Sequence, residues 1–337
     1  MKINLNKSNQ FGLLFVAILL IFLAGLRPVG LDRDSIMYET ELLTQFHAIN
    51  WFSKEPTFWL IQQLNLNFFY GMSTPFFFIY AITGVFIKYL VINKISPFPF
   101  LSFIVYISFF YIIHEMTQIR AGVATAFVFW SMHDVINNKV KFFLAKIFFA
   151  TMFHASAIFF VFLYFIRPSL NFKDVILYTF LPIIGIAVMY LNILNEFFLF
   201  SSSYLPGFLS YKVELYYDLA NAGKMEEASP INIGNIVFII LTYFTLVYLF
   251  FHKNQGVYVR PIIILSAKWL SVGVFILFSF SFIEVFAYRM SSYLLFPLVI
   301  IIPFVFTRFK PALIPLFFFV LYMAYNIYRT IQLLSFN

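Results

Sequence analysis

The sequence predicts an all-α, polytopic membrane protein with about ten transmembrane helices. Of its 337 residues, 62% are hydrophobic and only 11% are charged, whereas a soluble globular protein is about 45–50% apolar and about 25% charged. The apolar runs are long and continuous. They lack the alternation of an outer-membrane barrel, which favours helices as the spanning structure. We therefore expect a single transmembrane domain over residues 1–337.

The charge pattern and the missing residue types exclude several classes of protein. The net charge is +8, but the basic residues stand singly between apolar blocks, which is typical of topology signals and not of a nucleic-acid surface. Cysteine is absent, so disulfides and thiolate sites are excluded. The five histidines show no metal-ligand spacing. No metal, cofactor or nucleic acid is therefore expected.

The first apolar run, residues 11–26, follows Lys2 and Lys7. A cleaved signal peptide is the alternative, but no A-x-A-like site follows, so we expect a first span with its N-terminus in the cytoplasm. Residues 27–56 are polar and form a loop. Residues 57–70 are too short and too polar to span, and suit an amphipathic helix at the membrane interface.

The later apolar runs predict the remaining spans, and no internal repeat is evident among them. Their approximate ranges are 74–92, 97–113, 118–136, 142–165, 175–198, 231–251, 261–283, 290–307 and 311–329. A second polar loop, residues 201–230, lies between the sixth and seventh of all the predicted spans.

Segment 142–165 decides the topology. If it is a full span, loop 201–230 faces the cytoplasm, and Lys and Arg are divided evenly between the two sides. If residues 147–166 instead enter and return as a re-entrant hairpin, the positive-inside rule is satisfied better and both polar loops face outward. The backbone near His154 must then be broken and shielded by protein. We expect the hairpin.

Charged residues beside apolar runs need a reason, because a charge at membrane depth costs about 2.5–3.5 kcal/mol. Arg27 follows the first span and could fork onto a phosphate, with Asp32 orienting it or taking a proton. A solvated loop with ion pairs is the alternative. Arg120 heads a span that begins with small residues and points at the interface or a cavity. Its alternative is a snorkelling arginine.

Two further clusters carry candidate chemistry. His154 stands among phenylalanines and is a candidate base because of its near-neutral pKa, although a satisfied core histidine is the alternative. Glu284 and Arg289 face the outer side in the hairpin topology, unless they form only a structural ion pair. Arginines converging on one side suit an anionic lipid head group such as a pyrophosphate, and a transporter of anionic lipids would look similar.

Taken in order, these motifs resemble the EpsG family of polysaccharide-polymerising membrane proteins, related to the Wzy-type O-antigen and capsule polymerases. The match is strong over residues 25–166 and looser over 284–303. Arg33-Asp34-Ser35 and Ala121 depart from the family pattern, which leaves the acceptor contacts open. The matching residues are Arg27-x-x-Gly30-x-Asp32 with Tyr38, Glu55-Pro56, Ile119-Arg120-Ala121-Gly122, Phe153-His154-Ala155-Ser156-Ala157, and Arg289 with Tyr293.

The resemblance implies a polymerase on the outer face of the bacterial inner membrane, active in O-antigen, capsule or exopolysaccharide biosynthesis. Its fold would be similar to that of C-type glycosyltransferases, without a required metal. It would transfer a glycan from undecaprenyl pyrophosphate to the non-reducing end of another lipid-linked repeat unit. A flippase and a chain-length regulator are possible partners.

The same resemblance suggests roles for the candidate residues. His154 is the first choice of base for the acceptor hydroxyl and Asp32 the second. Fixed arginines would stabilise the leaving pyrophosphate, and the glutamates would orient them. The residues expected to contact pyrophosphate or glycan are Arg27, Arg120, Arg289, Tyr38, Glu55 and Glu284.

Two other functions remain open from the sequence, besides a scaffold without chemistry. A flippase or exporter of lipid-linked oligosaccharide would hold the same pyrophosphate, but should show two pseudo-symmetric halves. A membrane acyltransferase could use His154 as its base. Its substrate path should open to a cytoplasmic donor.

Overall fold

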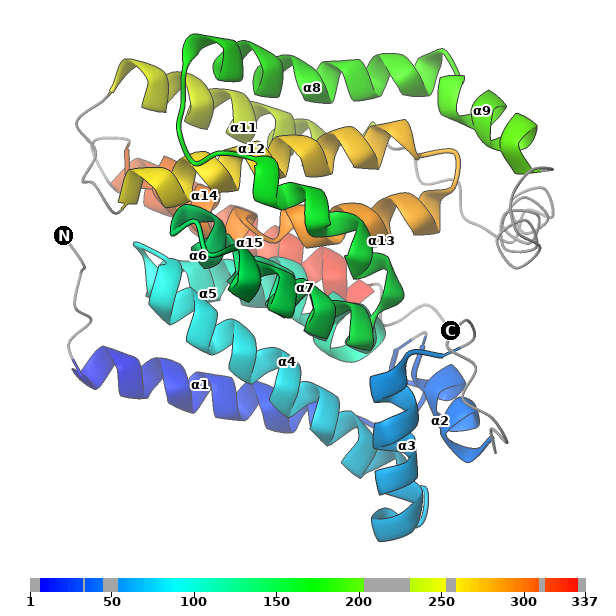
Figure 1. Cartoon of the computed structure of the whole chain (residues 1–337). Helices are drawn as coiled ribbons and strands as arrows, with labels where there is room; N and C mark the ends of the chain where they lie inside the picture. The colour runs from blue at the N-terminus through cyan, green and yellow to red at the C-terminus, as the bar shows by residue number, and fades with distance from the viewer. Residues whose placement is uncertain are drawn as a thin grey trace. The chain divides into compact units, whose positions relative to one another are not determined.

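The computed structural model describes residues 7–32, 34–44, 54–202, 231–252, 259–308 and 313–332, and every regular element in these ranges is helical (Figure 1). The polar loop predicted over 201–230 therefore lies almost entirely outside the described residues. The elements are α1 (Lys7–Gly25), α2 (Ser35–Leu43), α3 (Pro56–Phe69), α4 (Ser73–Ile95), α5 (Pro99–Tyr106), the π-helix η1 (Ile107–Thr117), α6 (Ile119–Ile136), α7 (Val140–Phe153), the 3-10 helix η2 (Ala155–Phe165), α8 (Phe172–Tyr190), α9 (Ile193–Ser202), α11 (Ile233–Phe251), α12 (Val259–Ser279), α13 (Glu284–Leu295), α14 (Leu298–Phe306) and α15 (Leu313–Gln332).

Five helical segments in the described part of the chain are long and apolar enough to cross a membrane, and α13 with α14 would make a sixth as one broken span. The five are Ser73–Ile95, Pro99–Thr117, Phe172–Tyr190, Ile233–Phe251 and Arg260–Ser279. The fold is therefore that of a helical, multi-pass membrane protein. The other predicted spans coincide with α1, α6, α7 with η2, and α15, which do not meet this criterion, so the total of about ten stays a prediction.

Several predicted spans are broken helices. The segment predicted as 175–198 divides after α8, where Asn192 adopts a left-handed backbone conformation with φ 54°. Such a residue ends a helix, because it turns the backbone out of the helical path. The segment predicted as 290–307 divides between α13 and α14, and the segment 142–165 divides at His154.

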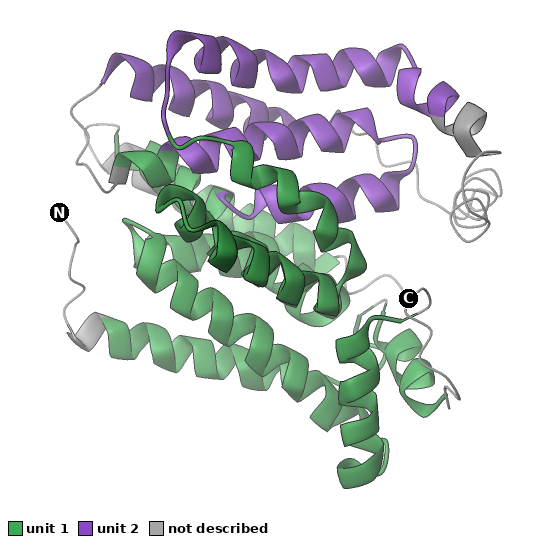
Figure 2. Ribbon diagram, in the orientation of Figure 1, with its two compact units in different colours: residues 1–168, 256–263, 298–337 green, residues 169–255, 264–297 purple. Residues whose placement is uncertain are grey.

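The chain forms two compact units, coloured separately in Figure 2. Unit 1 comprises Met1–Pro168, Gly256–Ile263 and Leu298–Asn337, and unit 2 comprises Ser169–Gln255 and Ile264–Pro297. Within unit 1, α1 runs along α4, and α6 packs against both α4 and α7 (Figure 1). Within unit 2, α8 runs along α11.

Small residues allow the helices of unit 1 to pack closely. A Cβ at Gly25 would lie 2.6 Å from the ring of Phe78, where α1 meets α4. A Cβ at Gly84 would overlap the Glu115 carboxylate, and one at Gly122 would overlap the backbone carbonyl of His114. Helix association in membranes depends on such close approach, so these glycines set the positions of α4, η1 and α6.

Candidate functional site

Glu55-Pro56 forms the start of α3 and leaves the carboxylate of Glu55 available for contacts outside this helix. Pro56 occupies the first turn of the helix, and Glu55 before it is extended, with φ −67° and ψ 149°. Proline favours both features, because it lacks a backbone N–H and disfavours a helical residue before it. The Glu55 side chain does not cap its own helix. Instead, its Oε2 accepts a hydrogen bond of 2.6 Å from Nη1 of Arg120, at the start of α6.

His154 ends α7 with an extended backbone, and η2 begins at the next residue. Nδ1 of His154 lies 3.5 Å from Oε1 of Glu55, and the backbone N–H of Ala155 approaches the same oxygen at 3.4 Å. The hydroxyl of Thr57 donates to the carbonyl of Met152 at 2.7 Å. This bond holds the start of α3 against the end of α7, so that the carboxylate and the imidazole face each other.

Glu55 therefore links Arg120 to His154, and we call these three residues the Glu55 site. Burial alone would raise the pKa of the Glu55 carboxyl, but the positive charge of Arg120, with a further contribution from His154, holds that pKa below its usual value. The side chains are 12%, 18% and 24% exposed for Glu55, Arg120 and His154 respectively. The site is thus partly buried, with an edge that a ligand can reach.

The rings of Phe58 and Tyr38, which we call the aromatic floor, lie beside the guanidinium of Arg120. Its guanidinium carbon lies 5.3 Å from the ring centroid of Phe58 and 5.7 Å from that of Tyr38, within the range of cation–π attraction. Tyr38 is buried on α2, as a member of the packed cluster beneath the site. The buried members of this cluster are Tyr38, Leu42, Phe58, Ile61, Phe76, Phe77, Tyr80, Ile119 and Val123.

Two charged residues that are not among the sequence-predicted candidates, Lys54 and Glu41, lie beside this floor. Lys54, which directly precedes Glu55, forms an ion pair with Glu41 of α2. Burial lowers the pKa of the Lys54 ammonium, and the positive charge of Arg120 adds to this effect against the attraction of Glu41. Adjacency to the Glu-Pro motif was the one sequence signal that could have identified Lys54.

Arg27 is buried and is occupied by protein groups. Its Nε donates to Oδ2 of Asp32 at 2.9 Å, and its two terminal nitrogens donate to the carbonyls of Ala24 and Met116 at 2.7 and 2.8 Å. The guanidinium also lies 3.8 Å above the ring of Phe77. Burial lowers the pKa of Arg27, against the opposing effect of Asp32. Arg27 thus forms an ion pair with Asp32, and its bond to the Met116 carbonyl joins the end of α1 to the end of η1.

The candidates on α13 belong to unit 2. Glu284 is the first residue of α13, Arg289 lies in the same helix, and Tyr293 is fully buried there. Arg27 and the three residues of the Glu55 site belong to unit 1. The convergence of Arg289 with Arg27 and Arg120 therefore stays a prediction.

A buried ion pair braces the helices behind the Glu55 site. Nζ of Lys88 on α4 donates to Oε1 of Glu115 at 2.5 Å and to the carbonyl of Gly122 at 2.8 Å. The hydroxyl of Tyr106 donates to the same Glu115 oxygen at 3.0 Å. Since Gly122 follows Arg120 by two residues, this network ties the first turn of α6 to α4 and η1.

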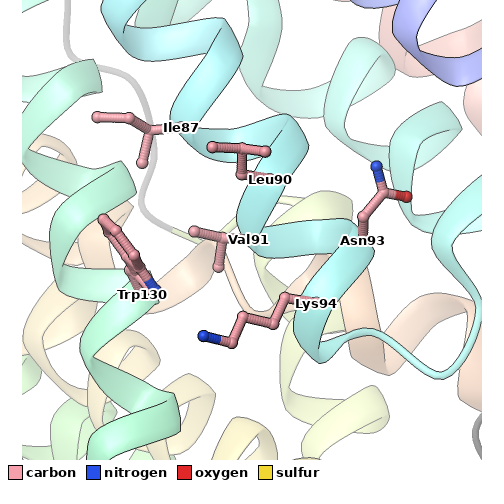
Figure 3. A pocket seen from close by; sticks show the side chains of 6 residues that line it. All are labelled: Ile87, Leu90, Val91, Asn93, Lys94 and Trp130. Carbon is pink, nitrogen blue, oxygen red and sulfur yellow. The ribbon is translucent and has the colours of Figure 1, made fainter.

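A cavity lies between α4 and α6, at some distance from the Glu55 site. Trp130, one of its lining residues, follows Arg120 by about 15 Å of helix at the standard rise, so the cavity is separate from the Glu55 site. Figure 3 shows the lysine ammonium of this cavity extending toward the tryptophan. The lining residues are Ile87, Leu90, Val91, Asn93, Lys94 and Trp130.

The described residues hold no group of three or more His, Asp or Glu side chains arranged to bind a metal ion. A family model described as the EpsG family matches the chain over residues 11–336. No curated protein and no solved structure matches the chain.

Proposed function

The chain belongs to the EpsG family, and on this premise we propose that it joins lipid-linked oligosaccharide repeat units by glycosyl transfer. The family indicates a general role in polysaccharide polymerisation, and the apolar helices indicate that this occurs in a membrane. The proposed donor is a glycan on undecaprenyl pyrophosphate. The proposed acceptor is the non-reducing end of another repeat unit.

The link that Glu55 makes between Arg120 and His154 is the observation that carries the proposal. The three residues come from three separate motifs, yet one carboxylate contacts both the cation and the imidazole. Glycosyl transfer from a pyrophosphate without a metal needs these two groups. A cation must stabilise the leaving pyrophosphate, and a base must accept the proton of the acceptor hydroxyl.

In the proposed step, Glu55 orients His154 through Nδ1, and Nε2 takes the proton of the acceptor hydroxyl. The hydroxyl oxygen forms a bond to the anomeric carbon of the donor sugar. The bond from this carbon to the pyrophosphate breaks, and its electron pair leaves with the pyrophosphate. Arg120 stabilises the charge that develops there, in a partly buried site where such stabilisation is strong.

The remaining candidates take supporting roles in this proposal. Arg27 and Asp32 hold the end of η1, from which α6 and Arg120 begin, and Asp32 is the second choice of base. Tyr38 supports Arg120 from below. Arg289 and Glu284 of unit 2 keep the roles that the family motif suggests for them, a cation for pyrophosphate and the carboxylate that orients it.

We also propose that the Glu55 site faces outward from the bacterial inner membrane. Arg27 joins the end of α1 to the end of η1, and α6 begins two residues after η1 ends, which fits helices that alternate in direction. The packing of α7 against η2 supports a re-entrant hairpin with His154 at its tip. In this topology, a flippase would deliver the substrate and a regulator would set the chain length.

The test is a deletion of the gene in its host, complemented with Arg120→Ala, His154→Ala or Glu55→Gln. Glycan length and lipid-linked intermediates are read by gel and mass spectrometry. We expect single repeat units in each strain, while the exposed controls Arg329→Ala and His252→Ala restore full-length glycan. Repeat units trapped on the cytoplasmic face would overturn the proposal in favour of a flippase. Full-length glycan lacking an acyl group would indicate an acyltransferase.

A further inference from the structure

Tyr80 carries a buried hydroxyl in the helix that supports the Glu55 site. The residue lies on α4 and is 1% exposed. Its Oη is buried, and the described part of the chain offers this atom no hydrogen-bond partner. Buried polar groups in folded proteins nearly always have a partner, because burial without one is destabilising. The Tyr80 hydroxyl therefore needs an explanation.

The ring contacts of Tyr80 place it under the Glu55 site. The ring packs against Phe76 at 5.1 Å and edge-on against Phe153 at 6.4 Å, and Phe153 directly precedes His154. Tyr80 also belongs to the same packed cluster as Phe58 and Tyr38, whose rings lie 5.3 and 5.7 Å from the guanidinium carbon of Arg120. The unpartnered oxygen thus belongs to a residue of the cluster that supports the cation of the site.

Two other buried tyrosines of unit 1 use their hydroxyls to hold the fold together. Tyr106 donates to Glu115 at 3.0 Å, and Tyr111 donates to the carbonyl of Leu20 at 2.6 Å. Each of these two hydroxyls thus has a protein acceptor. Since Tyr80 has none among the described residues, its acceptor is better sought in a ligand.

We propose that Tyr80 is a substrate-binding residue whose hydroxyl donates a hydrogen bond to a phosphate oxygen held by Arg120. This inference rests on the proposed function and adds a residue to its site. An anionic oxygen suits the position, because the guanidinium supplies charge and the phenol supplies one directed donor. A phosphate that takes the place of the Glu55 carboxylate on Arg120 would come within reach of this hydroxyl.

Tyr80→Phe tests the inference, because it removes one oxygen and keeps the ring contacts. We expect polymer formation to slow by about 10-fold or more, while the melting temperature in detergent is unchanged or higher. The matched control is Tyr106→Phe, which removes a hydroxyl that the fold uses, so its melting temperature should fall. A loss of activity in Tyr80→Phe that only follows a loss of stability would overturn the inference.

A binding measurement separates this inference from the proposed function. Inorganic pyrophosphate is added to the purified full-length protein, and the shift in melting temperature is recorded for wild type, Tyr80→Phe and Arg120→Ala. We expect a clear rise for wild type, a smaller rise for Tyr80→Phe and none for Arg120→Ala. Equal responses of wild type and Tyr80→Phe, or no response of wild type, would overturn the assignment of Tyr80.

The two ideas can therefore fail separately. If the deletion strain polymerises normally but pyrophosphate stabilises wild type more than Tyr80→Phe, the polymerase proposal fails and the tyrosine assignment stands. If deletion abolishes polymerisation while Tyr80→Phe restores it and responds to pyrophosphate as wild type does, the tyrosine assignment alone fails.

Discussion

The ammonium of Lys88 lies 2.5 Å from Oε1 of Glu115, and both side chains are buried within unit 1. Neither charge reaches water, so each depends on the other. The same ammonium also donates to the carbonyl of Gly122. The pair thus connects α4, η1 and α6 directly behind the first turn that carries Arg120, and its loss should affect the fold before it affects the chemistry.

We expect Lys88→Met to destabilise the protein by about 3–5 kcal/mol, because it leaves the Glu115 carboxylate buried without its cation. The double variant Lys88→Met with Glu115→Met removes both charges, and should recover much of that loss. Melting temperatures in detergent would show the difference. A single variant as stable as wild type would mean that water or another cation reaches Glu115.

The glycines that face this pair should not tolerate a methyl group. Gly122→Ala would force a Cβ into the His114 carbonyl, and Gly84→Ala would force one into the Glu115 carboxylate. We expect both variants to melt lower than wild type, Gly122→Ala more so, because a backbone carbonyl yields less than a side chain. Gly12→Ala is the control: it has open space around it and should be neutral or stabilising by about 0.5–1 kcal/mol.

Arg27 and Arg120 should differ in what their loss changes. Arg27→Gln leaves Asp32 buried without its ion pair and should cost about 3–5 kcal/mol of stability. Arg120→Gln removes a partly exposed guanidinium, so activity should fall by about 100-fold or more with a smaller change in stability. Melting temperature and polymer formation are measured on both variants. Equal losses of stability would contradict the separation of roles.

The lowered pKa of Glu55 predicts how acid affects the site. A carboxyl whose pKa is lower in the folded state than in the unfolded chain contributes stability above its usual pKa of about 4.3, and loses it as the pH falls through the lowered value. Burial opposes this lowering, while Arg120 and His154 cause it. The ionised Glu55 should therefore stabilise the fold from neutral pH down to about pH 5.

Glu55→Gln tests this pH dependence. The melting temperatures of wild type and variant are compared from about pH 7 to about pH 3, a range that brackets the usual pKa of a carboxyl group. Wild type should be the more stable at neutral pH, and the difference should shrink on acidification. A difference that grows as the pH falls would show that Glu55 has a raised pKa and is protonated in the folded protein.

Local sequence signals predicted the helix ends that form the Glu55 site. The amphipathic helix expected over 57–70 is α3, Pro56–Phe69, because proline fixes the start of a helix through its own backbone. The break expected near His154 is present between α7 and η2. The breaks after α8 and between α13 and α14 were missed, because a continuous apolar run hides a change in backbone direction.

The sequence by itself determined that the chain is a helical membrane protein of the EpsG family, since hydropathy and motif order are properties of neighbouring residues. The tertiary structure decided which side chains meet. Arg120 and Glu55 are 65 positions apart, and Lys88 and Glu115 are 27 apart. Such pairs depend on how each helix is rotated against its neighbours, and that rotation is set by packing at contacts such as Gly84 and Gly122, which no single segment encodes.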